Sequence, residues 1–244
     1  MKKRNNTTNG NAPQQRLYTE SMKLADLLES DYRLLSIVSR LRIPLGFGEM
    51  TVGDMCRRHG LSPDIFLLIC RIYSADGDFV PDPDLLSTSD LTDIMDYLHR
   101  SHIYYSGSVI PNLGCKIGKM MDSCGAIHRK ILSTFYSDYC SEVAHHFDYE
   151  EKTVFPYIRA LLAGETPAGH GYSIEKFEEN HSDIDAKLSD LTSIIIKYLP
   201  DSCPAGVRYD VLFDIFRFEE DLSRHTEIEN NVLIPLVEKL ENNG

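Results

Sequence analysis

The sequence predicts an all-α protein, an up-down-up-down four-helix bundle preceded by a small N-terminal helical domain. Apolar residues recur at intervals of three and four along most of the chain, which is the periodicity of amphipathic helices. Few segments show the alternation of apolar and polar residues that is typical of strands. Four long helical segments joined by short connections favour an antiparallel bundle.

The elements can be placed in order along the chain. We expect residues 1–16 to be a disordered tail, 17–80 to form the small helical domain, and 81–88 to be a linker, rich in Pro, Asp and Ser, before a bundle over 89–244. The first bundle helix is predicted from about Ser89 to Val109, ending before Pro111. The others are predicted over about 114–162, with room for a break near Gly125, and over 173–200 and 207–240.

The acidic composition narrows the class of protein. Lys and Arg number 25 and Asp and Glu number 37, so the net charge of −12 argues against nucleic-acid binding, which needs basic partners for phosphate. No segment approaches the ~18 apolar residues of a membrane helix. The basic N-terminus has no apolar stretch behind it, so we expect no secretory signal and a cytoplasmic protein. The six cysteines form no CxxC pair, and we expect scattered reduced thiols rather than a zinc site or disulfides.

Four histidines reveal an internal repeat. His102 precedes His146 by 44 residues, and His181 precedes His225 by the same 44. Each residue of the first pair lies 79 positions before its counterpart in the second pair. The same offset relates three further pairs: Glu150 and Glu229, Glu142 and Asp221, and Pro156 and Pro235. The bundle is therefore predicted to consist of two duplicated helical hairpins.

This repeat predicts a dinuclear metal site. His and Glu at positions i and i+4 lie on one face of a helix, so each hairpin offers one lone His from one helix and a His-x-x-x-Glu pair from the next. Imidazole and carboxylate groups projecting into a bundle core form a recurrent di-iron arrangement. The predicted ligands are His102, His146, Glu150, His181, His225 and Glu229.

Three other residues are candidates for supporting these ligands. Glu142 and Asp221 each lie one turn before a predicted ligand, where a carboxylate can orient an imidazole N–H group. Charges solvated on the helix surface would explain both residues equally well. His99 lies one turn before His102 on a similar face and is a third candidate.

On these residues the chain resembles the hemerythrin-like superfamily and, more narrowly, the repair-of-iron-centres (RIC) family, di-iron proteins linked to recovery of iron–sulfur clusters after nitric oxide or oxidative damage. The resemblance rests on His102 and on the segments HHFDYEEKTVFP, EENHSD and RHTEIENNVLIP. It implies two non-haem, oxo-bridged irons, each bound by two histidines and bridged by Glu150 and Glu229. Oxygen-carrying hemerythrins have a second histidine four residues before the one in their third helix, and their fourth helix ends in His-x-x-x-x-Asp. Here Phe177 and Glu229 stand instead, which argues against simple oxygen carriage.

The N-terminal domain resembles that of the RIC family more faintly. The segment IPLGFGE places Gly46 and Phe47 where that family has two adjacent cysteines, so we assign no thiol chemistry to it. The next segment has a helix-turn-helix shape, with Thr51 as N-cap and Gly60 as C-cap. Because acidic residues outnumber basic ones there, a docking or dimerisation role is favoured over DNA binding.

Three functional hypotheses follow. The leading one is a cytosolic di-iron protein that repairs iron–sulfur clusters, by donating iron to client iron–sulfur proteins or by redox chemistry of nitric oxide. The second is an O2 or NO sensor whose N-terminal domain transmits the state of the metal site, for which a homodimer would be one assembly. The third is a di-iron oxidase or peroxidase, so the pattern leaves open whether the protein is an enzyme.

Overall fold

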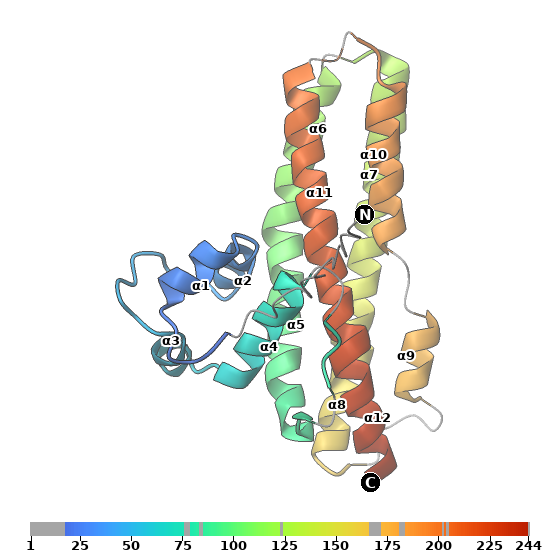
Figure 1. The fold of residues 1–244 in the computed structure, drawn as a ribbon. Helices are drawn as coiled ribbons and strands as arrows, with labels where there is room; N and C mark the ends of the chain where they lie inside the picture. Colours follow the sequence, from blue (N-terminus) through green and yellow to red (C-terminus); the bar gives the residue numbers. More distant parts are fainter. Residues whose placement is uncertain are drawn as a thin grey trace, which may run out of the picture.

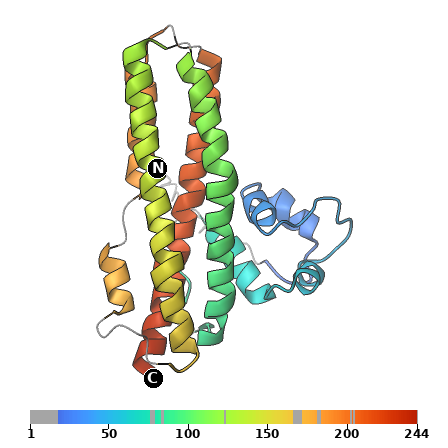
Figure 2. The same cartoon turned by 180° about the vertical axis from the view of Figure 1, so that it is seen from behind.

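The computed structural model describes residues 18–75, 79–82, 85–122, 124–165, 172–180, 184–201, 203 and 205–243. Over these residues the chain forms helices and loops with one isolated bridge, between Lys23 and Thr51, and no strand. The prediction of an all-α protein is therefore confirmed. Figures 1 and 2 show long, near-parallel helices with a group of short helices against one side.

The short helices precede the bundle in the chain: α1 Leu24–Ser30, α2 Leu34–Arg40, α3 Val52–His59 and α4 Pro63–Ser74. The predicted caps of α3 are both present. The Thr51 hydroxyl accepts a hydrogen bond from the Asp54 N–H at 3.1 Å, and Gly60 ends the helix in the left-handed conformation. Ser62 caps α4 in the same way, with Pro63 at its first position. Local sequence signals thus account for the helix-turn-helix shape of this segment.

Three rods of the bundle are long and each contains a π-helical turn. The first consists of α5 Leu91–Tyr104, η3 Tyr105–Val109 and α6 Ile110–Asp122, and follows a short 3₁₀ turn, η2 Thr88–Asp90, capped by Ser87. The second consists of α7 Ala126–Tyr149, η4 Glu150–Val154 and α8 Phe155–Leu162. The last consists of α11 Ala205–Ile228, η5 Glu229–Leu233 and α12 Ile234–Asn243. No described helix is long and apolar enough to cross a membrane.

The first rod corrects the predicted helix boundaries. We expected it to end before Pro111, but it continues to Asp122, and the second rod starts at Ala126 rather than near residue 114. Proline disrupts a regular α-helix because it lacks an N–H and its ring meets the carbonyl four residues earlier. Here each π-turn is followed by a proline as the second residue of the next α-helix, at Pro111, Pro156 and Pro235. The widened turn lets the rod continue past the proline, and the break expected near Gly125 is confirmed.

The third bundle helix is described in two parts, α9 Ile174–Asn180 and α10 Ile184–Tyr198. Figures 1 and 2 both draw α9 off the axis of α10 and beside α12, so the expectation of one helix over 173–200 is wrong. Ile174 and Phe177 are buried in the apolar core, and the Ile174 N–H donates to Glu241 Oε1 at 2.9 Å. Contacts with α12 therefore hold α9 where it lies.

Two apolar clusters fill the interior. One joins the N-terminal helices to α5 and the lower bundle and includes Leu98, Phe155 and Val232. The other fills the upper bundle and includes Tyr105 and Leu222. The π-turns η4 and η5 begin between the clusters, so polar side chains there lie in a layer between two apolar cores.

The cysteines correct another expectation. Cys124 and Cys203 form a disulfide between the loop that follows α6 and the loop that precedes α11. Their separation of 79 residues equals the repeat offset, so the bond joins equivalent positions of the two hairpins. This equality is visible in the sequence, but the search for CxxC pairs did not compare the cysteine positions with the repeat offset. Cys56 and Cys70 are the buried thiols we expected, and burial raises the pKa of Cys56 to about 12.

Candidate metal centre

Four predicted ligands from three rods gather in the layer between the apolar clusters. Each of His102, Glu150, His225 and Glu229 offers a ligand atom, and these atoms all lie within 4.8 Å of one another. Relative exposure of the four residues is 4% or less. Such a group of buried titratable side chains requires partners, because an unpaired buried charge is costly.

His146 joins this group through its i+4 neighbour. Its Nε2 lies 2.7 Å from Glu150 Oε1, and the equivalent His225 Nε2 lies 2.9 Å from Glu229 Oε1. His102 completes the arrangement, with its Nε2 3.0 Å from Glu150 Oε2. The structure thus brings five of the six predicted ligands together. The sixth, His181, lies outside the described residues.

The backbone explains why these carboxylates point inward. Glu150 and Glu229 are each the first residue of a π-turn, at the same place in the two hairpins. A π-turn changes the angular register of a helix, and such turns are frequent at functional sites. The histidine four residues earlier still lies in regular α-helix, so the side chains of each pair meet on one face.

The donor set fits a cation. His102 Nε2 and His225 Nε2 face each other at 3.2 Å, and each also faces a buried carboxylate. Imidazole lone pairs and carboxylate oxygens therefore converge on one small volume, as they do in metal sites of helix bundles. A bound cation would supply the positive charge that two buried carboxylates require.

Electrostatics around His102 show the strength of the negative field. Burial alone would lower the pKa of His102, but its hydrogen bonds to Glu150 and Glu151, with the charge of Glu229, raise the pKa to about 9. A field that stabilises a proton on imidazole also attracts a metal cation to the same position.

Glu151 is a functional candidate that the sequence analysis missed. Its Oε1 lies 2.7 Å from His102 Nδ1 and 2.9 Å from His99 Nδ1. A carboxylate that accepts the Nδ1–H bond fixes the imidazole so that Nε2 faces the metal position. His99 therefore contacts Glu151, which in turn holds the predicted ligand His102. The sequence signal for Glu151 was its position directly after Glu150. In a regular α-helix, however, adjacent residues point in different directions, so Glu151 was not expected to face the bundle interior.

Aromatic rings surround the group. The His102 ring stacks on Phe147 at a centroid distance of 4.3 Å and on Phe155 at 5.8 Å. Tyr105 meets the His225 ring edge-on at 5.6 Å. These rings fix the imidazole orientations and limit the access of water.

The two carboxylates that precede the ligands have different partners. Asp221 accepts a hydrogen bond from Arg40 Nη2 at 2.5 Å, and the Arg40 side chain is fully buried. Arg40 also donates to the hydroxyls of Tyr73 at 2.6 Å, of Tyr105 at 3.0 Å and of Tyr97. Asp221 therefore joins the N-terminal helices to the rod that carries His225.

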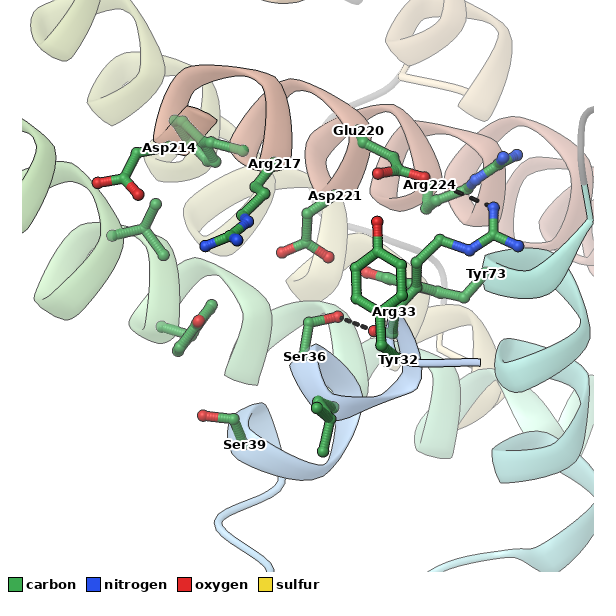
Figure 3. Close-up of a pocket in the computed structure, with 14 residues that line it drawn as sticks. Tyr32, Arg33, Ser36, Ser39, Tyr73, Asp214, Arg217, Glu220, Asp221 and Arg224 are labelled. Carbon is green, nitrogen blue, oxygen red and sulfur yellow. Dashed lines mark hydrogen bonds and ion pairs between the residues drawn. The ribbon is translucent and has the colours of Figure 1, made fainter. Parts of the chain in front are cut away.

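Asp221 also lines a cleft of about 510 Å³ between α2 and α11. Figure 3 shows Asp221 on the α11 side of this cleft and Ser36 and Ser39 on the α2 side. Glu142, by contrast, forms an exposed ion pair with Lys187 and does not reach the ligand group.

The comparisons with known proteins agree with the donor set. A family model described as the hemerythrin HHE cation binding domain matches residues 112–237, just over half of the chain. No curated protein and no solved structure matches the chain. The matched segment contains the two His-x-x-x-Glu pairs, whereas His102 precedes it.

Proposed function

The chain belongs to the hemerythrin HHE cation-binding family, and from this premise we propose that its bundle holds two non-haem irons. The ligands in this proposal are His102, His146, Glu150, His181, His225 and Glu229. The observation that carries it is the convergence of three imidazoles and two carboxylates, all buried, on one volume between two apolar cores. Iron is preferred among metals because mixed imidazole and carboxylate ligation in a helix bundle suits it.

The residues of the chain would have distinct tasks at such a centre. Glu150 and Glu229 would supply carboxylate oxygens to the cations, since Glu150 faces His102 and His146 and Glu229 faces His225. Glu151 would keep the Nε2 of His102 directed at the metal. Phe147 and Phe155 would keep bulk water from the imidazole. The two irons would supply one-electron redox chemistry and open coordination positions for small diatomic molecules such as NO and O2.

The biological role we propose is repair of iron–sulfur clusters in the cytoplasm after nitric oxide or oxidative damage. Support comes from the resemblance to RIC proteins and from the histidine-rich ligand set, which leaves positions for diatomic ligands. The Cys124–Cys203 disulfide bears on this location, because disulfides persist chiefly in oxidising compartments. Trapping the thiols of Cys124 and Cys203 in acid-quenched cells decides between a reduced and an oxidised compartment.

A sensor of NO or O2 is the second candidate. The observation that favours it is the Arg40–Asp221 pair, which connects the N-terminal helices to the turn before His225. Repair predicts iron that transfers to an apo-cluster client protein. Sensing predicts iron that stays bound while NO changes the assembly or the docking of the N-terminal helices.

Metal analysis of the purified protein tests the proposal. We expect about two irons per chain and an absorption band of the oxidised centre, with anaerobic NO titration changing the spectrum of the reduced protein. His146→Ala and Glu229→Gln should each remove most of the iron, whereas His59→Ala, on α3 outside the site, should leave it unchanged. Full iron content in both ligand variants would refute the site.

A further inference from the structure

A second polar cavity lies outside the metal centre, against the N-terminal helices. It has a volume of about 600 Å³ and is formed by the end of α2, by α5 and by η3. Its charged lining consists of Arg40, Arg42, Arg100 and His99, with Asp96 as the one acid among the lining residues that the structure describes. A basic cavity is unexpected in a chain whose net charge is −12.

The positive charge of this cavity is only partly neutralised. Arg100 Nε pairs with Asp96 at 2.8 Å, and Arg40 pairs with Asp221. Arg40 Nε is buried and has no acceptor among the described residues. Arg42 has no ion-pair partner within the described part of the chain. Arg42 is exposed and lines the cavity, so its charge faces the cavity without a counterion among the residues that the structure describes.

The backbone at Arg42 makes its side chain noteworthy. Arg42 has a φ of 54°, in the left-handed region that favours glycine. The Arg42 N–H donates to Ser39 O and the Ile43 N–H donates to Val38 O, both at 3.0 Å, which is the pattern of a Schellman helix end.

Two other helices of the chain end in the same pattern with glycine at the left-handed position. Gly60 has this role after α3 and Gly164 after α8. The helix end alone therefore favours glycine at position 42. Attraction to the helix C-terminus is a weak reason for an arginine there, since Arg40 already occupies the last turn of α2. The arginine is better explained by what its side chain faces.

We propose that this cavity binds a small organic anion carrying a phosphate or carboxylate group. Arg42 and Arg100 would bind the oxyanion, since guanidinium groups match both phosphate and carboxylate geometry. His99 would add a ring nitrogen, and Ile103 and Tyr104 provide an apolar wall for the organic part. A volume of about 600 Å³ suits a small organic molecule better than a bare inorganic ion.

The cavity is connected to the metal centre by two hydrogen-bonded routes. His99 shares Glu151 with His102, and Arg40 bonds Asp221, one turn before His225. An anion bound there would contact the outer members of both routes. Anion binding at this cavity needs no metal, so it can be tested independently of the proposed iron centre.

Titration calorimetry on the full-length protein tests the site. Phenyl phosphate and benzoate are the anionic probes, and benzamide is the uncharged probe of similar size. We expect at least one anion to bind and benzamide not to bind. Stronger binding of phenyl phosphate would identify phosphate esters as the ligand class, and stronger binding of benzoate would identify carboxylates. Absence of binding by both anions would overturn the proposal.

Arg42→Gly separates a binding role from a structural one. We expect it to weaken anion binding about tenfold or more, because a charge-assisted hydrogen bond is lost. The melting temperature should stay within about 2 °C of the parent or rise, because glycine suits the left-handed conformation. Arg58→Gln, which removes an exposed arginine of α3 that does not line the cavity, is the control and should change neither quantity. Unchanged anion affinity in Arg42→Gly, or a clear fall in its melting temperature, would contradict the assignment.

Discussion

The two hairpins of the bundle carry the same ligand pattern in different surroundings. Glu142 and Asp221 are equivalent by the 79-residue offset, and each lies one turn before a histidine predicted to bind metal. Glu142 forms an exposed pair with Lys187, whereas Asp221 accepts from the buried Arg40. The N-terminal helices pack on only one side of the bundle (Figure 1). The duplication thus places a carboxylate at the same position in both hairpins, and the N-terminal helices packed beside Asp221 determine which partner it binds.

The position after each glutamate of the two His-x-x-x-Glu pairs differs in the same way. Glu151 in the first hairpin holds His102 and His99, whereas its counterpart in the second hairpin is the exposed Asn230. The His-x-x-x-Glu pair itself is present in both halves, with similar His–Glu distances. Around the His-x-x-x-Glu pairs, the asymmetry therefore lies in the groups behind the predicted ligands, where affinity and partner contacts can be adjusted.

Breaking the Arg40–Asp221 pair should have the largest effect. Arg40→Met leaves Asp221, whose side chain is 12% exposed, without its partner and should lower the free energy of unfolding by about 3 kcal/mol. Urea denaturation followed by circular dichroism measures this, since the chain has no tryptophan. The double variant Arg40→Met with Asp221→Leu should recover part of the loss, because two apolar residues replace the pair. A double variant as unstable as the single one would mean that the tyrosine contacts of Arg40, not Asp221, carry the effect.

The Cys124–Cys203 bond joins equivalent positions of the two hairpins, and its loss should have the second largest effect. Closing a chain segment of 79 residues restricts the unfolded state, and disulfides of this kind contribute about 2–4 kcal/mol. Cys124→Ser with Cys203→Ser should lower stability by that amount, and the reductant should no longer affect the variant. Metal content should stay the same, because the bond lies at the loops far from the π-turns. Loss of iron in this variant would instead link the loops to the centre.

The sequence predicted those features that depend on local patterns or on the repeat. Helical periodicity predicted the fold class, and the shared offset predicted six ligands, five of which the structure brings together. The caps at Thr51 and Gly60 follow from side chains that act within their own turn.

The features that the sequence did not predict depend on contacts between distant residues or on an altered helix register. Arg40 meets Asp221 across 181 residues of chain, and no local pattern encodes that contact. Pro111 was read as a helix end because the rule for proline assumes a regular α-helix, and a π-turn removes that assumption. Glu151 was missed for the same reason, since a π-turn begins at Glu150.

Glu151→Gln tests the asymmetry behind the ligands directly. The amide keeps the shape of the side chain but loses the charge that holds His102 Nδ1–H, so metal affinity should fall about 10- to 100-fold. Competition with a chelator measures the change. Asn230→Ala at the equivalent position of the other hairpin should leave metal affinity unchanged, because Asn230 is exposed. Equal losses in both variants would mean that the two halves are supported alike, contrary to the comparison.

Loss of the Glu142–Lys187 pair should have the smallest effect on stability. This pair is therefore the reference for the Arg40–Asp221 pair. The side chains of Glu142 and Lys187 are 47% and 39% exposed, so water screens their attraction. Lys187→Ala should lower the free energy of unfolding by about 0.5 kcal/mol or less, and added salt should reduce even that difference. Urea denaturation at low and high ionic strength measures both. A loss comparable to that of Arg40→Met would show that the two hairpins are held in the same way after all, and that the N-terminal helices do not set the role of Asp221.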